Sequence, residues 1–297
     1  MVNVEAYLQE KAELIEKNLA DYLPPQNKFP TVIHESMHYS VFAGGKRLRP
    51  ILMLAAGELF DGDLDEMMPY ACAVELIHTY SLVHDDLPAL DNDDLRRGKA
   101  TNHKVFGEAN AILTGDGLLN RAYEIMLQQG LEGNLDREVY LRSAKEISDA
   151  IGTNGMIGGQ VVDLDMEGKE IDENTLLYIH NNKTGKLLSA SIKAGAILAL
   201  AKKDDIERLS RFSQYVGLGF QIVDDILDVI GEEEKIGKKI GQDEDIDKAT
   251  FPRVFGLQNS KKEANIMLEK ALEELSYYGD KANILKELTK FLINRDY

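Results

Sequence analysis

The chain contains the run Ser81-Leu82-Val83-His84-Asp85-Asp86-Leu87-Pro88-Ala89-Leu90-Asp91-Asn92-Asp93-Asp94-Leu95-Arg96-Arg97-Gly98, in which five aspartates fall within ten residues. Residues 71–87 are mostly apolar with helical spacing, which predicts a helix with a buried face. This helix carries Asp85 and Asp86 to its C-terminal end, where the helix dipole disfavours negative charge. The neighbouring carboxylates also raise each other's pKa. A divalent cation bound here would remove both costs.

The chemistry of this cluster indicates which ligands it binds. Clustered carboxylates suit a hard ion such as Mg²⁺, which proteins hold through a few carboxylates together with substrate phosphates. Arg96 and Arg97 follow at once and suit a phosphate. The run therefore predicts a magnesium site for a phosphorylated substrate.

A second acidic cluster lies in the run Gly219-Phe220-Gln221-Ile222-Val223-Asp224-Asp225-Ile226-Leu227-Asp228. Its three aspartates are offset from Gln221 by 3, 4 and 7 residues, which places all four on one face of a helix. The residues between them are apolar. An acidic stripe on an otherwise buried helix is costly unless it faces a cavity that holds water or metal.

The sequence as a whole predicts an all-α protein. It has 297 residues, of which 44% are hydrophobic, enough for a large core. No proline lies between Pro88 and Pro252, so long uninterrupted helices are possible there. We expect residues 1–297 to form a single domain. The expected helices are 4–22, 31–43, 51–60, 68–87, 108–129, 136–153, 173–201, 260–276 and 281–293.

Charge and composition exclude several classes of function. The net charge is −17, which argues against a protein that binds nucleic acid or an anionic membrane. Cys72 is the only cysteine, so no disulfide within the chain is expected and a reducing compartment fits. Acidic residues within 1–17 argue against a signal peptide, and no segment is apolar enough to span a bilayer. We expect a cytoplasmic protein.

Two further motifs each allow a functional and a structural interpretation. Gly44-Gly45-Lys46-Arg47-Leu48-Arg49-Pro50 could clamp a diphosphate, or could be a helix end with glycine caps and cations that neutralise the dipole. Gly185, inside a predicted helix, indicates a kink or a close approach that turns Lys183 and Thr184 inward. Alternatively, Lys183 is a surface lysine.

Taken in this order, the motifs resemble those of the short-chain trans-isoprenyl diphosphate synthases, most closely the bacterial type of farnesyl diphosphate synthase. The matching blocks are Gly44 to Pro50, Asp85 to Gly98, Gly158-Gly159-Gln160, Lys183-Thr184-Gly185, Gln221 to Asp228, and a lysine-rich segment that ends at Lys248. Asp85 and Asp91 are six residues apart, with Pro88 between them, as in the bacterial class. A helix cannot pass Pro88 undisturbed, so Asp91 is expected to reach the metal from a loop.

The resemblance implies an antiparallel helical barrel around a deep apolar cavity, and a homodimer. It implies three Mg²⁺ ions bound with an allylic diphosphate. The metal ligands would be Asp85 and Asp91, with Asp86, for two ions, and Asp224, with Asp228 behind it, for the third. The allylic diphosphate would be bound by Arg96, Lys183, Lys238 or Lys239, and Lys248. Isopentenyl diphosphate would be bound by Lys46, Arg49, His78 and Arg97. Catalysis would rest on Lys183, Thr184, Gln221 and Arg96.

His78 lies seven residues before Asp85 and so shares its helical face. This position favours a ligand contact, whereas a lone histidine on a helix is usually a packed residue. Tyr80 lies five residues before Asp85, about 7.5 Å along the helix axis. In the family, an aromatic residue here is the floor that limits product length, and Ser81 beside it is too small for this. The alternative is that Tyr80 merely packs between helices.

The resemblance therefore implies condensation of isopentenyl diphosphate with an allylic diphosphate to give farnesyl diphosphate. A geranylgeranyl diphosphate synthase is the first alternative. A terpene cyclase would not need the cationic pocket of Lys46, Arg49 and Arg97. A non-catalytic synthase subunit should lack an aspartate motif, and a generic acidic metal-binding protein would leave the lysines unexplained.

Overall fold

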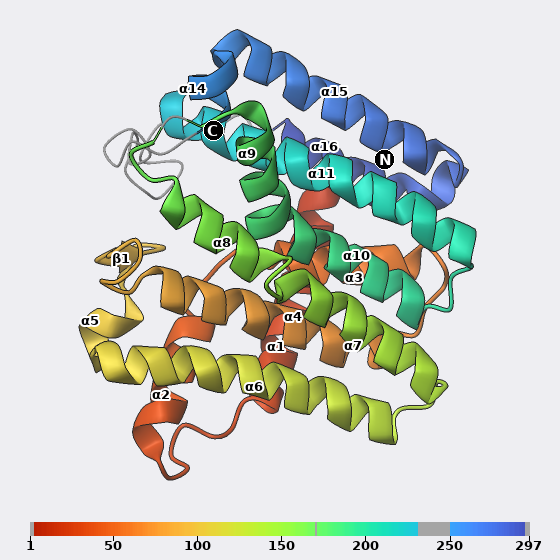
Figure 1. Cartoon of the computed structure of the whole chain (residues 1–297). Coiled ribbons are helices and arrows are strands. Elements are labelled where there is room, and N and C mark those ends of the chain that lie inside the picture. Colours follow the sequence, from red (N-terminus) through yellow and green to blue (C-terminus); the bar gives the residue numbers. More distant parts are fainter. Residues whose placement is uncertain (1–2, 170, 231–249, 295–297) are drawn as a thin grey trace.

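Helices make up most of the chain, as the sequence predicts (Figure 1). The computed structural model describes residues 3–169, 171–230 and 250–294. The helices are α1 (Val4–Tyr22), α2 (Thr31–Val41), α3 (Leu48–Glu58), α4 (Leu64–Asp85), α5 (Asn102–Phe106), α6 (Glu108–Glu132), α7 (Arg137–Ile151), α8 (Met156–Asp165), α9 (Glu173–Ile179), α10 (Lys186–Leu198), α11 (Lys203–Ile230), α14 (Phe251–Phe255), α15 (Leu257–Ser276) and α16 (Asn283–Ile293). A π-helical turn η1 (His180–Gly185), a 3₁₀ turn η2 (Gly279–Ala282) and a short hairpin of β1 (Leu95–Arg96) and β2 (Lys99–Ala100) complete the fold.

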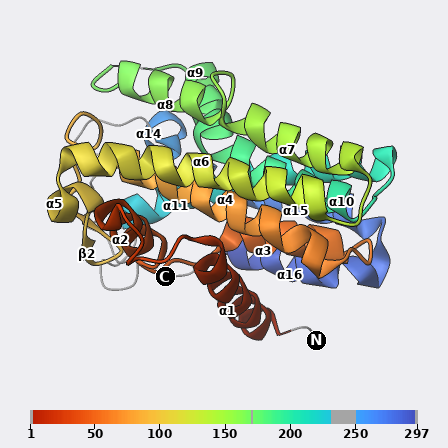
Figure 2. The same cartoon turned by 90° about the horizontal axis from the view of Figure 1, so that it is seen from below.

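The long helices pack side by side around α4 and α10 (Figures 1 and 2). Helix α4 packs against α3 and α6, and α10 packs against α3, α7 and α11. Helix α15 packs along α11. Among the described residues, no helix is both long and apolar enough to cross a membrane.

Helix α4 is the central element because it is apolar on nearly all sides. Its residues from Glu66 to Ile77 are all buried, and so are Thr79, Tyr80 and Val83. A helix without a polar face is stable only inside the protein. Its C-terminal end therefore delivers Asp85 to the interior of one end of the helical assembly.

The two ends of α4 differ from the predicted range 68–87. The helix starts earlier because Asp63 caps it, its side chain accepting a hydrogen bond from the Asp65 amide at 3.0 Å. Pro69 lies early in α4, where it removes only one backbone hydrogen bond. The helix ends at Asp85, ahead of Pro88, because the residues before a proline disfavour helical geometry.

The sequence pattern missed the short elements. Residues Arg97 and Gly98 join β1 to β2 with φ angles of 54° and 74°, as in the type I′ turn that suits a two-residue hairpin. Helices α5, α8 and α14 were also not predicted, because elements of five to ten residues carry too few periodic positions.

A buried carboxylate joins α4 to the α6–α7 connection. Glu66 is 3% exposed and accepts hydrogen bonds from Gln129 at 2.6 Å, from the Asn134 amide at 3.0 Å, and from the Tyr140 hydroxyl. Burial raises the pKa of Glu66, but the hydrogen bonds from Tyr140, Asn134 and Gln129 together lower it below its ordinary value. The ionised form therefore stabilises the fold.

Replacing Glu66 by Gln should lower the free energy of unfolding by about 2 kcal/mol at neutral pH, because several hydrogen bonds to a charged group are weakened. The pKa of Glu66 is lowered on folding, so its contribution is present above the unfolded pKa and is lost as the pH falls. Urea unfolding of both proteins at pH 7 and near pH 4 would test this. The difference should shrink in acid, and a constant difference would contradict the interpretation.

Candidate active site

The loop after α4 brings Asp91 back beside Asp85. The Asp91 amide donates to the Asp85 carbonyl oxygen at 2.9 Å, and the Asn92 amide donates to the Leu87 carbonyl oxygen at 3.1 Å. Asn92 has a φ of 52°, a left-handed conformation that asparagine tolerates well. The helix thus ends before Pro88 and Asp91 lies in a loop, as predicted.

Three elements meet at the Asp85 carboxylate. Gln160 of α8 donates to Asp85 Oδ1 at 2.7 Å. Lys183 of η1 has its Nζ 3.9 Å from the same oxygen and 2.7 Å from Asp163 Oδ2. The side chains of Asp85, Asp163 and Lys183 are between 11% and 21% exposed, so this charged group is largely shielded from water. Asp163 was not singled out from the sequence, although it belongs to the run that follows Gln160.

The Asp86 side chain forms an ion pair with Arg96, whereas the Asp85 side chain contacts Gln160 and Lys183. Arg96 Nε donates to Asp86 Oδ1 at 2.5 Å, and Arg96 Nη2 lies 3.4 Å from Asp93 Oδ2. Burial raises the pKa of Asp86 to about 7, while Arg96 opposes this rise. The position of Arg96 beside the motif is therefore set by Asp86 and Asp93.

The predicted irregularity before Gly185 is a π-helical turn. Residues 180–185 form η1 between α9 and α10, and such turns are frequent at functional sites. A methyl group on Gly217 of α11 would lie 3.1 Å from Gly185 Cα, so the two backbones approach closely. The prediction of a close approach at Gly185 is confirmed. The turn presents Lys183 toward Asp85, and Thr184 beside it is half-buried.

In the second aspartate motif, Asp225 organises its surroundings. It accepts hydrogen bonds from Gln221 at 2.9 Å and from the Phe251 amide at 2.9 Å, and its Oδ2 lies 3.0 Å from His180 Nε2. Asp225 thereby joins α11 to η1 and α14. Asp224 is half-buried, whereas Asp228 is 2% exposed. The helical spacing placed these aspartates on one face, but it gave no signal that Asp225 and His180 would pair.

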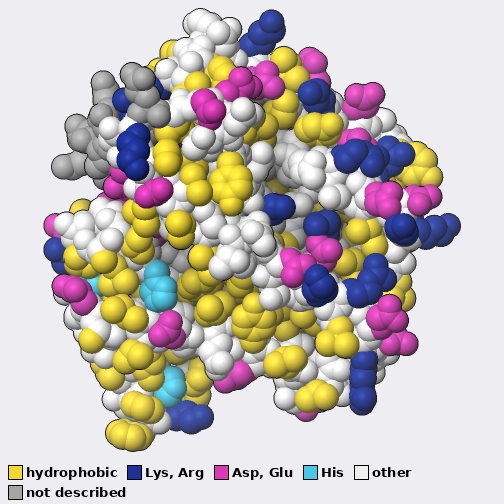
Figure 3. All heavy atoms as spheres, in the orientation of Figure 1, with side chains coloured by type: hydrophobic (Ala, Val, Ile, Leu, Met, Phe, Trp, Pro, Cys, Tyr) yellow, Lys and Arg dark blue, Asp and Glu magenta, His cyan; other side chains and the backbone are white. Residues whose placement is uncertain are grey.

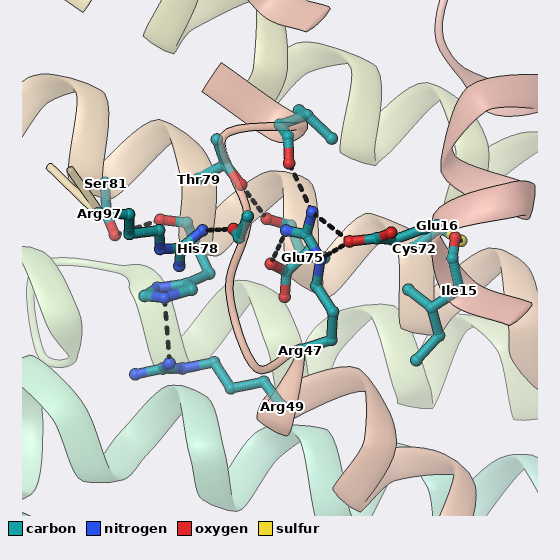
Figure 4. A network of polar contacts seen from close by, with 12 residues as sticks. Ile15, Glu16, Arg47, Arg49, Cys72, Glu75, His78, Thr79, Ser81 and Arg97 are labelled. Carbon is teal, nitrogen blue, oxygen red and sulfur yellow. Dashed lines mark hydrogen bonds and ion pairs between the residues drawn. The ribbon is translucent and has the colours of Figure 1, made fainter. Parts of the chain in front are cut away.

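A group of cationic side chains lies near the start of α3 (Figure 4). Arg49 Nη1 is 3.3 Å from His78 Nε2, and Arg97 donates to the Gly44 carbonyl oxygen. Burial, followed by the charges of Arg49 and Arg97, lowers the pKa of His78 well below its ordinary value, so its ring is neutral. An arginine can only donate, so His78 Nε2 is the acceptor and the proton lies on Nδ1.

The Arg49 side chain has a hydrogen-bond donor that could bind a ligand. Its Nε is buried and makes no hydrogen bond within the described ranges. Burial lowers the pKa of Arg49, and the charges of Glu75 and Asp224 raise it. A buried donor without a partner is costly, and an anion bound here would satisfy it. Lys46 is exposed at the edge of this group.

Tyr80 is 6% exposed, and its ring meets the His84 ring edge-on with 5.9 Å between centroids. Burial, then the nearby Tyr123, raises the pKa of its hydroxyl to about 12. Ser81 donates to the His78 carbonyl oxygen at 2.8 Å. The burial of Tyr80 is compatible with both interpretations, in which its ring either limits the product length or merely packs between helices.

The predicted diphosphate ligands Lys238, Lys239 and Lys248 lie outside the described residues.

Charged side chains, and not cavity size, locate the candidate site. A cavity of about 30 Å³ beside the first motif is lined by residues that include Asp86, Arg96 and Arg97. A groove of about 750 Å³ lies elsewhere, between α7, η1, α10, α11 and α15, and none of the residues predicted to bind substrate lines it. Figure 3 shows the face of the molecule that is turned to the viewer in Figure 1, on which Lys and Arg side chains lie beside Asp and Glu side chains.

The chain is similar over its whole length to known enzymes. The model of the family described as polyprenyl synthetase matches residues 30–288. The geranylgeranyl diphosphate synthase of Cyanophora paradoxa is 46% identical over 99% of this chain and 97% of its own length. The farnesyl diphosphate synthase of Bacillus subtilis is 44% identical over 98% of each chain. The crystal structure of an FPP/GFPP synthase from Zymomonas mobilis matches with a TM-score of 0.87 and 35% identity, and covers 98% of this chain and 99% of that chain.

An all-α fold with two aspartate motifs and a separate cationic group defines a prenyltransferase of the isoprenyl synthase type. The chain belongs to the polyprenyl synthetase family. Relatives with similar identities are named for fifteen-carbon and for twenty-carbon products, so the family match does not decide the product length.

Gly159 is required where α8 meets η1. A methyl group at this position would lie 2.3 Å from the Lys183 backbone nitrogen. Gly159→Ala should therefore displace η1, lower the free energy of unfolding by about 1–3 kcal/mol and reduce prenyl transfer by about tenfold. Gly117→Ala on α6 is the matched control, since its methyl group would lie 3.5 Å from Met37 Sδ and alanine favours the helix. Unfolding curves and initial rates of both variants would decide, and equal behaviour would contradict the proposed contact.

Proposed function

We propose that the chain condenses isopentenyl diphosphate with dimethylallyl or geranyl diphosphate and releases farnesyl diphosphate and diphosphate. The observation that carries this proposal is the presence of two groups of cations with different partners. In one, Lys183 lies beside Asp85, which suits a metal-bound diphosphate; we assign Asp224 to this site from the resemblance. The other contains Arg49, His78 and Arg97, and suits a diphosphate without metal. A terpene cyclase would need only the first site.

The first site would bind the allylic substrate. Lys183 lies close to Asp85 and Arg96 lies beside Asp86, which supports contacts of both cations with a diphosphate at these carboxylates. We assign Lys238 or Lys239, and Lys248, to the same diphosphate from the resemblance alone.

Mg²⁺ is the cofactor of this family in general. Among the described residues, no three His, Cys, Asp or Glu side chains are grouped closely enough to hold a metal by themselves. This fits Mg²⁺, which binds through one or two carboxylates plus substrate phosphates. Asp85 and Asp91, with Asp86, would hold two ions, and Asp224, with Asp228 behind it, would hold a third. Bound Mg²⁺ would supply positive charge that stabilises the leaving diphosphate.

The reaction proceeds by ionisation, condensation and elimination. Lys183 and Arg96 stabilise the diphosphate as its bond to the allylic carbon breaks. The Thr184 oxygen and the Gln221 amide oxygen direct their dipoles at the carbocation; Gln221 is oriented by its bond to Asp225. The isopentenyl double bond attacks the cation, and the departed diphosphate accepts the proton that is then lost. Apolar walls keep water from quenching the cation.

We also propose that the chain forms a homodimer and is cytoplasmic. Large apolar side chains are exposed along α6 and at the start of α7, which supports an interface there. They are Ile112, Leu113, Leu127, Leu131 and Leu141, each between 47% and 69% exposed.

Several relatives are named as chloroplastic proteins, so the compartment differs among members of the family.

A geranylgeranyl diphosphate synthase is the second candidate, because relatives with that name are as similar to this chain as the farnesyl diphosphate synthases are. The resemblance supports the fifteen-carbon product, because Tyr80 is an aromatic residue at the position that limits product length in the family.

Incubation of the protein with Mg²⁺, isopentenyl diphosphate and geranyl diphosphate tests the function. Asp85→Ala and Asp224→Ala should each lower turnover about a thousandfold or more, roughly 4 kcal/mol of barrier. Asp94→Ala is the control from the same aspartate run, because that carboxylate is exposed and pairs with Lys104 at 2.6 Å. Near-normal turnover in Asp85→Ala would rule out the mechanism.

Product length depends on Tyr80 in this proposal. Tyr80→Ser should remove the floor and yield geranylgeranyl diphosphate or longer products. Tyr80→Phe should keep the fifteen-carbon product, since the hydroxyl makes no hydrogen bond within the described chain. Products would be dephosphorylated and sized by chromatography. An active Tyr80→Ser variant that still stops at fifteen carbons would place the floor elsewhere.

A further inference from the structure

Glu75 is a buried carboxylate with no part in the reaction described above. It lies on α4, three residues before His78, and is 2% exposed. Its Oε1 accepts a hydrogen bond from Arg47 Nη1 at 2.6 Å (Figure 4). Burying two charges is costly unless they are closely paired and otherwise bonded. The pair therefore calls for an explanation beyond packing.

Arg47 fastens the loop before α3 to three helices. Besides Glu75, its Nη2 contacts Glu16 of α1 at 3.1 Å and donates to the Val41 carbonyl oxygen at the end of α2 at 2.6 Å. Its φ is 51°, a left-handed conformation that is unfavourable for a residue other than glycine. These contacts hold Arg47 in that conformation, directly before the first turn of α3.

The fastened loop carries the cations proposed to bind isopentenyl diphosphate. Lys46 immediately precedes Arg47, and Arg49 follows two residues later. Arg49 reaches His78 on α4, and Arg97 donates to the Gly44 carbonyl oxygen at the other end of the loop. The loop that Arg47 holds thus leads directly into the turn of α3 that carries Arg49.

Charge supports the same conclusion. Burial lowers the pKa of Arg49 and of Arg97, and in both cases the carboxylate of Glu75 is the strongest opposing influence. The charge of Glu75 thus offsets part of the cost of burying the two arginines, while its short hydrogen bond is made to Arg47. Its charge therefore contributes to the stability of the group that Arg49 and Arg97 form.

We propose that Glu75, acting through Arg47, is the positioning residue of the isopentenyl diphosphate pocket. This inference rests on the function proposed above. The Arg47–Glu75 pair positions Arg49 and Arg97 for a diphosphate that carries no metal. The pair has no role in binding the allylic substrate.

The test is Glu75→Gln, which keeps the size of the side chain and removes its charge. The KM for isopentenyl diphosphate should rise by about tenfold or more, while the KM for geranyl diphosphate should change by less than about twofold. Glu66→Gln is the matched control, since it makes the same change at an equally buried position of the same helix. It should lose stability and leave both KM values unchanged.

Ligand-dependent thermal unfolding gives a second readout. Isopentenyl diphosphate without Mg²⁺ should raise the Tm of the wild type and of Glu66→Gln, and should not raise that of Glu75→Gln. Glu75→Asp, which restores the charge, should recover part of the shift. If Glu75→Gln does not fold, Arg47→Lys should show the same selective KM change, because it keeps the charge but loses the paired donors.

Equal rises of both KM values in Glu75→Gln, or no rise for isopentenyl diphosphate, would overturn the inference. A wild-type protein that does not consume isopentenyl diphosphate would refute the proposed function itself. The two failures are distinguishable because the second appears before any variant is made.

Discussion

Several like charges share a small volume in this protein, and contacts with charges of opposite sign reduce the repulsion between them. Lys183 lies between Asp85 and Asp163, and Arg96 contacts Asp86. Repulsion between bare carboxylates would otherwise favour their protonation or a separation of the helices that carry them. The pairing keeps the carboxylates together and places cations beside them, which is the arrangement that a metal-bound diphosphate requires.

The π-helical turn η1 connects the two aspartate motifs. Lys183 on η1 approaches Asp85 of the first motif, and His180 on the same turn contacts Asp225 of the second. Gly159 and Gly217 allow α8 and α11 to come close to this turn. In a regular α-helix, the direction of the side chains rotates by about 100° per residue. A π-helical turn is wider, so it changes the direction in which the following side chains point. The distance between the two motifs therefore depends on one irregular segment.

Polar side chains to which we assign no substrate contact hold several residues of the candidate site. Asp225 holds Gln221, Asp163 holds Lys183, and Arg47 is held by Glu16 and Glu75. Such contacts reduce the freedom of the groups that we propose to bind the substrate, so less entropy would be lost on binding. Their burial also strengthens each interaction, because little water competes for the same atoms.

The sequence by itself determined the helical class, the family resemblance and the loop position of Asp91, because periodic apolar residues, ordered motifs and Pro88 are local signals. The range of α1 was predicted to the residue, and an irregularity was correctly expected at Gly185. Only the tertiary structure decided that Asp86 pairs with Arg96, that His180 meets Asp225, and that Arg47 meets Glu75. Those partners are between 10 and 45 residues apart, and their contacts depend on how helices pack, which no local pattern of residues encodes.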